Sequence, residues 1–354
     1  MSDLWLLPWS GAPDQADFVE VFAELPGRAR RDPYRAGLPP ATWWTALLDL
    51  PRPREFWIAE TGGRAVGRVG ASLSLTFPAT GYLGFFELDV NDLARDAVAG
   101  ALLDTARAWL GERGVRTIYG PLDLATWFNY RFRVPAEGSA DEEAEASFAW
   151  EPVNPPEYAR WFAEAGFREA ERYCSVGFRI DDPALVDLVV ATTGLAHDQA
   201  RDKGLSFRPL DAARLEAELA VLYALSMEAF GENFLFEPIP LEVFRALYVA
   251  GVARLAEPLI HFVLDPQGRE AGFVFAFIDR GYAVIKTIAV RPQFRGRKVS
   301  TALMHLVFRD AAARGLHRAI AALVKTDSTS AILAARHERV QAWRHEYALY
   351  EQCL

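Results

Sequence analysis

The chain of 354 residues repeats one order of expected secondary structure about 200 positions apart. Each copy reads as a strand, two helices, a hairpin, a further strand, a helix and another strand. Matching positions are separated by 200 to 205 residues, namely Trp57 and Phe262, Gly67 and Gly272, Phe85 and Ile285, and Gly114 and Gly315. An internal duplication explains this agreement better than chance similarity between two ordinary α/β patterns. The sequence therefore predicts two similar domains that join near residue 200.

Hydrophobic periodicity and turn residues give the expected elements of each copy. In the first copy we expect strands at residues 5–7, 56–60, 64–73, 81–88 and 115–119, and helices at residues 14–24, 41–48 and 92–112. The joining region is expected to hold a strand at 147–152, a helix at 155–165, a strand at 167–180 and a connecting helix at 182–202, after an acidic surface loop at 137–145. In the second copy we expect strands at 205–210, 260–265, 270–278, 282–290 and 317–324, and helices at 211–230, 241–255 and up to Gly315.

Composition narrows the class of protein. With 51% hydrophobic and 24% charged residues, the chain is typical of a soluble globular protein with enough apolar residues for two cores. Its formal charge of -9 and pI near 5.3 argue against general binding of nucleic acid, which depends on clustered Lys and Arg. We therefore expect no nucleic-acid partner.

Neither cysteine nor any apolar run indicates export from the cell. Cys174 and Cys353 lie far apart and match no metal-binding or redox spacing, so we expect reduced thiols, no metal and a cytoplasmic location. The first residues have no basic stretch before a long apolar one, and no run approaches the roughly 18 apolar residues of a membrane span. Secretion and membrane insertion are both disfavoured.

Residues 284–308 (VIKTIAVRPQFRGRKVSTALMHLVF) contain a basic loop between a β-branched strand and an amphipathic helix. Pro292 ends the strand, and helical spacing begins at Val299. The loop carries four cations and one glycine, namely Arg291, Arg295, Arg297, Lys298 and Gly296. Free backbone N–H groups at a helix start, together with the helix dipole and nearby cations, favour an anion. The loop therefore predicts a site for a phosphate-bearing cofactor.

The equivalent turn of the first copy is acidic. Residues 88–96 read LDVNDLARD, so Asp89, Asp92 and Asp96 stand where the second copy has cations. Carboxylates at a helix start satisfy the dipole themselves and repel a diphosphate. The sequence therefore predicts that only the second copy binds the cofactor.

The order of elements around AVRPQFRGRKVSTALM (residues 289–304) resembles that of the GNAT superfamily of acyl-CoA-dependent N-acyltransferases. Residues 205–354 resemble the whole of that fold and residues 1–180 a degenerate second copy, with residues 181–204 as a connecting helix or linker. The segments YGP (119–121), WEPVNPP (150–156) and NFLFEP (233–238) resemble those of bacterial two-domain GNAT proteins. The resemblance implies an α/β fold of two tandem GNAT-like domains, each a mostly antiparallel mixed sheet flanked by helices.

The resemblance also implies acetyl-CoA or another acyl-CoA as cofactor. In the family, the loop pattern is Arg or Gln, two residues, Gly, one residue, then Gly or Ala, and its backbone amides hold the CoA pyrophosphate. Here that register falls on Arg295, Lys298 and Ser300, so Lys and Ser replace the two small residues. The cofactor-binding residues implied are Ile288, Ala289, Val290, Arg295, Gly296, Arg297, Lys298, Val299, Ser300 and Thr301.

Catalysis in the family is direct attack of an amine on a thioester, which needs a proton acceptor and a donor to the leaving thiolate. Glu237 is our first candidate for the base, because its loop follows the first helix of the domain, and Tyr282 and Lys286 on the central strand are others. The family's donor is usually a Tyr, and our alignment places Ala335 there; Ser330 is our candidate substitute, with Ser328 and His337 as further possibilities.

Two other classes of function stay open beside acyl transfer to an unidentified small-molecule or peptide amine. Aminoacyl-tRNA-dependent transferases share the tandem GNAT fold, and residues 286–318 could form one basic patch, although the acidic pI counts against it. A non-catalytic acyl-CoA-binding or interaction protein would explain the altered glycine positions and the absent Tyr. The sequence does not indicate an oligomeric state.

Overall fold

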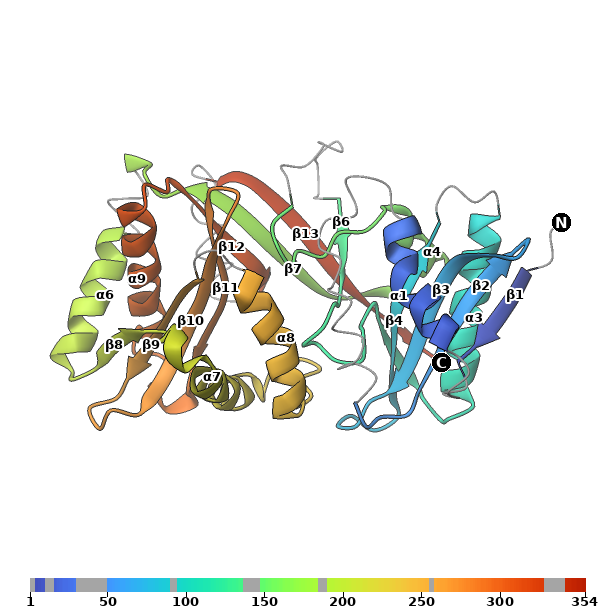
Figure 1. The fold of residues 1–354 in the computed structure, drawn as a ribbon, viewed down its shortest axis with the longest axis horizontal. Helices are drawn as coiled ribbons and strands as arrows, with labels where there is room; N and C mark the ends of the chain where they lie inside the picture. Colours follow the sequence, from blue (N-terminus) through green and yellow to red (C-terminus); the bar gives the residue numbers. More distant parts are fainter. Residues whose placement is uncertain are drawn as a thin grey trace. The chain divides into compact units, whose positions relative to one another are not determined.

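The computed structural model describes residues 4–9, 16–29, 50–89, 94–135, 147–183, 190–254, 258–327 and 341–354. The chain forms two compact units, Met1–Tyr173 with Glu346–Leu354 (unit 1) and Cys174–His345 (unit 2) (Figure 1). The division falls within two strands, β7 (Arg168–Arg179) and β13 (Gln341–Cys353), so that each contributes to both units. Residues 346–354, expected in the second domain, thus group with unit 1.

Unit 1 contains a mixed sheet in the order β1-β2-β3-β4-β5-β13. The strands before β13 are β1 (Leu4–Pro8), β2 (Arg54–Thr61), β3 (Arg64–Leu73), β4 (Thr80–Leu88) and β5 (Thr117–Gly120), and the short strand β6 (Phe132–Val134) also pairs with β13. Only β4 and β5 run parallel, and the other neighbouring pairs are antiparallel. The helices of this unit are α1 (Ala16–Ala29), α3 (Arg95–Gly111) and α4 (Glu157–Glu164).

Helices cover both faces of the unit 1 sheet. The buried residues of α3 recur with the spacing of one helical face, namely Val98, Ala99, Leu102, Leu103, Ala106 and Leu110. They share a core with Trp57 of β2 and Leu83 of β4. Phe56 alternates with Trp57 and so lies on the other face, where its ring is 5.1 Å from that of Phe22 on α1.

Unit 2 repeats this arrangement in the order β12-β11-β10-β9-β8. Its strands are β8 (Ser206–Pro209), β9 (Pro258–Leu264), β10 (Glu270–Asp279), β11 (Tyr282–Val290) and β12 (Arg318–Lys325). Among these five strands, only the neighbours β11 and β12 run parallel. The helices are α6 (Ala191–Asp202), α7 (Leu215–Phe230), α8 (Leu241–Arg254) and α9 (Val299–Ala313), with 3-10 turns η3 (Ala212–Arg214) and η4 (Pro292–Phe294).

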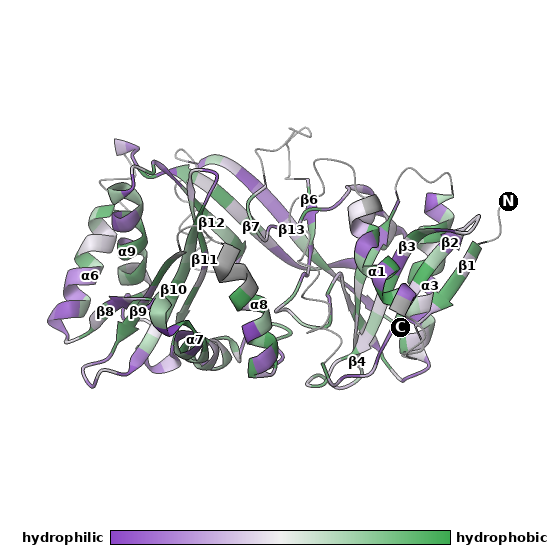
Figure 2. Cartoon of the chain, viewed as in Figure 1, coloured by the Kyte–Doolittle hydropathy of each residue, from purple (hydrophilic) through white to green (hydrophobic). Residues whose placement is uncertain are grey.

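The unit 2 sheet also packs on both faces, and Figure 2 shows β9 to β11 as mostly hydrophobic. On one face, α9 places Leu303 and Val307 in a core with Val274 and Ile285. Phe275 alternates with Val274, and on the opposite face its ring lies 5.8 Å from that of Tyr248 on α8. Each unit therefore has the mostly antiparallel mixed sheet flanked by helices that the resemblance to the GNAT superfamily implies.

Most expected elements occur within a few residues of their predicted bounds, and β11 matches its range 282–290. One prediction is wrong, because residues 147–152 form no strand. Trp150 has a left-handed φ of 65°, and Glu151 N–H donates to Phe148 O at 3.1 Å, so the segment turns back on itself. The Glu151 carboxylate accepts from Phe148 N–H at 3.2 Å, which holds this turn. The apolar residues of this segment gave the sequence pattern of a strand because they are buried, not because they are extended.

Some expectations fall outside the described residues, namely the helix at 41–48, the acidic loop at 137–145, and residues 184–189 of the connecting helix, of which α6 covers the later part. Strand β13 has no counterpart among the expected ranges. Where the chain is described, no helix combines the length and the apolar character needed to cross a bilayer. Those same ranges hold no group of three or more His, Cys, Asp or Glu suited to a metal ion.

Candidate functional site

The two parallel strands of unit 2 separate part-way along their length. The β11–β12 register runs from Tyr282↔Arg318 to Ile285↔Ala321, although β11 continues to Val290 and β12 to Lys325. On its other edge, β11 stays paired with β10 as far as Val290↔Gly272. Since alternate residues of a strand direct their N–H and C=O groups to opposite edges, the second half of β11 presents polar backbone groups that β12 does not take up.

A β-bulge marks the point of separation. Phe275 pairs with Thr287 and the next residue, Ala276, pairs with Ile285, so Lys286 is an extra residue in β11. A bulge bends its strand and increases the local twist. Such a bend explains why the pairing of β11 with β12 ends here.

The residues expected on this strand lie beside the opening. Ile288 and Val290 are half-buried against the core that α9 covers, whereas Ala289 is buried. Gly272 lies opposite Val290, and a Cβ at Gly272 would come within 2.5 Å of Ala289 O. Glycine therefore lets β10 hold this end of β11 closely in place.

The basic loop leads directly into the start of α9. Gly296 has φ +73°, with nothing near the position of a Cβ, and Lys298 has φ 61° and ψ 20° in the left-handed region. The first hydrogen bond into α9 runs from Ala302 N–H to Lys298 O, so the N–H groups of residues 299–301 point out of the helix start. Val299 is buried and anchors the helix, while Ser300 is exposed.

Ion pairs engage two of the four loop cations. Arg291 donates to Glu270 O at 2.8 Å and pairs with Glu228. Arg295 donates to Glu232 Oε2 at 2.9 Å and to Ala229 O at 2.7 Å. These contacts tie the loop to the end of α7.

The other two cations remain available. Arg297 lies 5.6 Å from the centre of the Phe294 ring, and both Arg297 and Lys298 are exposed. In the described ranges no carboxylate forms an ion pair with either side chain. The helix start and these two cations together form an exposed positive surface suited to an anion.

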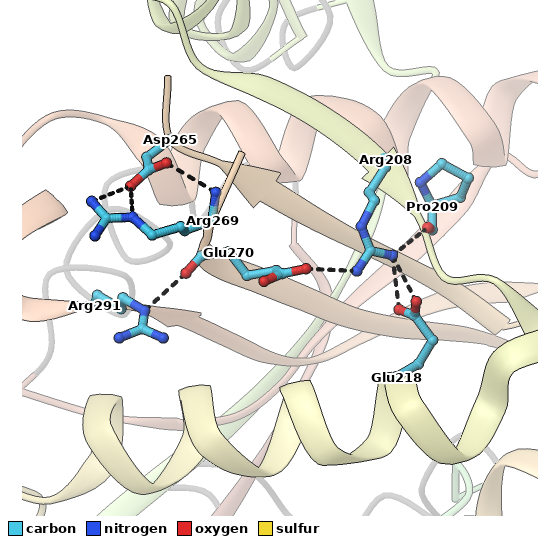
Figure 3. A network of polar contacts seen from close by, with 7 residues as sticks. All are labelled: Arg208, Pro209, Glu218, Asp265, Arg269, Glu270 and Arg291. Atoms are coloured by element: carbon cyan, nitrogen blue, oxygen red, sulfur yellow. Dashed lines mark hydrogen bonds and ion pairs between the residues drawn. The ribbon is translucent and has the colours of Figure 1, made fainter. Parts of the chain in front are cut away.

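A polar network centred on Arg208 and Glu270 contacts Arg291, the first residue of the loop (Figure 3). Arg208 on β8 donates to both carboxylate oxygens of Glu218, at 3.0 and 2.8 Å, and to Glu270 Oε1 at 3.0 Å. Burial acts to lower the pKa of Arg208, but its hydrogen bonds to the two carboxylates raise it overall. Glu270 in turn offers its backbone oxygen to Arg291. The network therefore joins β8, α7 and β10 to the first residue of the loop.

The structure brings the expected cofactor residues together but not all the catalytic candidates. Glu237, between α7 and α8, is 1% exposed and so is a buried carboxylate. Tyr282 lies at the far end of β11, about 26 Å from Val290 at the rise of a strand. Its hydroxyl oxygen accepts from Arg318 Nη1 at 3.3 Å and Trp343 Nε1 at 3.5 Å. Ser330, like Ala335 and His337, lies outside the described residues.

The sequence alone did not identify Glu228 and Glu232 as partners of the loop arginines, nor the network of Arg208. Acids near the end of α7 are a signal, but their partners lie 63 residues away in the chain. Spacing along the sequence gives no information about such a pairing.

The corresponding place in unit 1 is closed by the chain itself. The β4–β5 register is parallel only from Thr80↔Thr117 to Tyr82↔Tyr119. Beyond it, Leu122 N–H donates to Leu83 O at 2.9 Å, and Asp123 Oδ1 accepts from Phe85 N–H at 2.5 Å. These contacts occupy the edge of β4 that corresponds to the edge of β11 not paired with β12.

A second contact closes the end of the same strand. Tyr158 Oη accepts from Leu88 N–H at 2.9 Å and donates to Glu87 Oε1 at 2.5 Å. Acids of the adjoining turn are paired as well. Asp89 Oδ2 accepts from Arg64 at 2.9 Å, and hydrogen bonds from Arg160 and Trp161 lower the pKa of Asp96. Residues 90–93, which include Asp92, lie outside the described residues.

Comparison with known proteins agrees with this geometry. Residues 219–337, which include β11, the basic loop and α9, match the model of the Acetyltransferase (GNAT) family. This part of the chain belongs to the GNAT family. Proteins with curated functions yield no match to the sequence.

Solved structures of GNAT proteins share the fold of the whole chain. A tandem GNAT protein from the clavulanic acid biosynthesis pathway aligns with 99% of this chain and 98% of its own at 15% identity, with a TM-score of 0.59. A probable N-acyltransferase from Enterococcus faecalis V583 aligns with 99% of this chain and 73% of its own at 7% identity, with a TM-score of 0.57. A GCN5-related N-acetyltransferase from Kribbella flavida aligns with 99% and 72% at 12% identity, with a TM-score of 0.51.

These findings confirm the expected superfamily, the tandem GNAT fold and the acyltransferase class. A GNAT acetyltransferase fold supports transfer of an acyl group to an amine in general. The identities are too low to carry a substrate from these structures to this chain.

Proposed function

We propose that the chain is an acyl-CoA-dependent N-acyltransferase with acetyl-CoA as its donor. In this proposal the second domain, residues 205–354, binds the acyl-CoA, and the first, residues 1–180, binds none. The observation that carries it is the exposed start of α9, which lies directly after the half of β11 that is not paired with β12. The acceptor is an amine of a small molecule or peptide.

The residues of the loop fit a CoA pyrophosphate. Residues 299–301 direct N–H groups out of the helix start, and Arg297 and Lys298 add two positive charges without a carboxylate partner in the described ranges. The left-handed φ of Lys298 matches the position where the family has glycine, so the loop can take the family's backbone course. Arg295, Gly296 and the backbone of Ile288, Ala289 and Val290 complete the proposed site.

The chemistry requires a base, and Glu237 is the candidate. The acyl-CoA supplies a thioester carbonyl that an amine can attack. Glu237, directly or through water, takes the proton that the amine loses as its bond to carbon forms. The 1% exposure of this carboxylate supports a protected position rather than a solvent-facing loop acid. Ser330 remains the proposed donor of a proton to the departing thiolate.

The closing of unit 1 supports a single cofactor site. Asp123 and Tyr158 accept hydrogen bonds from backbone N–H groups of β4 on the edge that corresponds to the edge of β11 not paired with β12. A second cofactor would have to displace both contacts and approach the acidic turn around Asp89.

Calorimetric titration with CoA tests the cofactor proposal. We expect one CoA per chain, and we expect Arg297→Ala and Lys298→Ala to weaken binding because each removes a charge at the phosphate. Arg201→Ala, at an exposed arginine on α6, is the matched control and should bind as the wild type does. Absence of CoA binding, or two molecules per chain, would contradict the proposal.

Release of thiol from acetyl-CoA over a panel of amines separates an enzyme from a silent binding protein. Glu237→Gln should lower kcat by about 10²–10⁴, the usual contribution of a general base. An unchanged rate across pH would exclude Glu237 as the base. Binding without thiol release for any amine would favour the non-catalytic alternative.

A further inference from the structure

Three side chains of unit 2 meet at the end of β11 remote from the basic loop. Arg318, the first residue of β12, lies beside Tyr282, with its guanidinium carbon 5.0 Å from the ring centre. Arg318 Nη1 and Trp343 Nε1 both donate to the Tyr282 hydroxyl oxygen. The rings of Tyr282 and Trp343 meet edge to face at 6.2 Å.

The chain makes room for Trp343 in this cluster. A Cβ on Gly177 of β7 would come within 2.2 Å of the indole, so any other residue there would displace it. The ring of His345 stacks on the indole at 4.3 Å. Trp343 is therefore fixed in place by its neighbours while remaining partly exposed.

The guanidinium of Arg318 donates a hydrogen bond to Tyr282 but pairs with no carboxylate of the described residues. Arg318 is exposed, and in the described part of the chain it forms no ion pair. Asp279 pairs with Tyr282 across the β10–β11 ladder and is not joined to Arg318 by an ion pair either. Since guanidinium carries five N–H donors and Arg318 uses one on Tyr282, a planar fork remains for a ligand.

The cluster lies on the face of the sheet that α8 covers. Phe275↔Thr287, Phe277↔Val284 and Asp279↔Tyr282 are cross-strand pairs, so these side chains share the face on which α8 packs. Tyr282 is four residues before the bulge at Lys286, or about 13 Å along the strand. In the proposed function, a cofactor held by the loop lies along the other half of β11, which leaves the Tyr282 end for the amine.

We propose that Arg318, positioned by Tyr282 and Trp343, binds a carboxylate on the acceptor, so that the acceptor is an amine carrying both a carboxylate and an apolar or aromatic group. This inference rests on the proposed function, because it assigns the substrate of the same site. A carboxylate matches the single positive charge and the two-pronged geometry of one guanidinium. The aromatic rings beside it supply contact area for the apolar group.

Two product-like probes test this without acyl-CoA. N-acetylphenylalanine carries the carboxylate, and N-(2-phenylethyl)acetamide is the same molecule without it. Titration of the full chain, followed by NMR, should show the carboxylate probe binding at least about tenfold more tightly, as expected for a charge-assisted pair. Arg318→Gln should abolish this preference, and Arg201→Gln should keep it.

The outcomes separate this inference from the cofactor proposal. Equal binding of the two probes, binding of neither, or a preference that survives Arg318→Gln would overturn the assignment of Arg318, whatever the CoA titration gives. Conversely, if the chain failed to bind CoA, the preference for the carboxylate probe could still be measured, because that titration contains no acyl-CoA. Circular dichroism of Arg318→Gln should match the wild type, since the side chain is exposed.

Discussion

The carboxylate of Asp123 accepts a hydrogen bond from the backbone N–H of Phe85 at 2.5 Å, where β4 has passed the end of its pairing with β5. Phe85 has φ 54° and is 5% exposed, so this N–H lies in a buried, irregular part of the strand. Asp123 itself is 8% exposed. In unit 1, the side chain of Asp123 therefore takes up a backbone N–H of β4, at the place where β11 of unit 2 is no longer paired with β12.

Replacing Asp123 by Ala should destabilise the chain by about 1–3 kcal/mol, because a buried N–H loses its acceptor. Urea unfolding followed by circular dichroism measures this loss. Asp123→Asn keeps an acceptor oxygen, so its free energy of unfolding should fall clearly less than that of Asp123→Ala. Equal losses in the two variants would mean that the hydrogen bond contributes nothing and that packing alone explains the effect.

Lys298 offers a test of the altered loop. A left-handed backbone costs a residue with a Cβ about 1–2 kcal/mol, whereas glycine adopts it freely but loses more entropy on folding. We therefore expect Lys298→Gly to raise the free energy of unfolding by about 0.5–1 kcal/mol. Lys298→Ala keeps the Cβ and should leave it nearly unchanged.

The same pair of variants separates backbone geometry from charge in CoA binding. Both lose the ammonium, so both should bind CoA more weakly than a site that keeps it, but Lys298→Gly should retain more affinity because its backbone approaches a phosphate more closely. If Lys298→Ala binds CoA as tightly as Lys298→Gly, the Cβ is no obstacle and the replacement of glycine by lysine has no geometric consequence.

The sequence predicts the duplicated fold because its signals are local. Pro292 ends β11 and helical spacing begins at Val299, so the strand, loop and helix can be placed to the residue. The separation of β11 from β12 cannot be predicted in this way, because it depends on the bulge at Lys286 and on where a strand distant in the sequence stops pairing. The prediction of a strand at residues 147–152 was wrong because it used a local signal alone. Buried apolar residues give the same sequence pattern in a turn as in a strand.

Arg208 should be essential for the stability of unit 2. Arg208→Met would leave the carboxylate of Glu218, which is 3% exposed, without its cation, at a cost of about 3–5 kcal/mol. The double variant Arg208→Met with Glu218→Gln should recover part of this loss, because the buried charge is gone. Urea unfolding of the single and double variants gives the coupling.

Arg269 is the matched control for Arg208. It pairs with the buried Asp265, but its own side chain is 76% exposed, and Asp265 also accepts from the backbone N–H groups of Gln267 and Arg269. Arg269→Met should therefore cost only about 0–1 kcal/mol. If Arg269→Met lost as much stability as Arg208→Met, burial of the carboxylate would set the cost. The backbone donors that Asp265 keeps would then make no difference.

His261 should make the stability of unit 2 depend on pH. Its Nε2 lies 2.8 Å from Asp310 Oδ2, and burial lowers the pKa of His261 below its ordinary value of 6.5, against the opposing effect of Asp310. Because the folded pKa is below the unfolded one, the contribution of neutral His261 is complete above about pH 6.5 and is lost as the pH falls through the folded pKa, by at most about 1.4 kcal/mol per pH unit. Urea unfolding on both sides of this pH measures the loss. It should shrink in His261→Gln without vanishing, since burial lowers the pKa of His305 as well, and it should grow in Asp310→Asn. An unchanged loss in His261→Gln would contradict this origin.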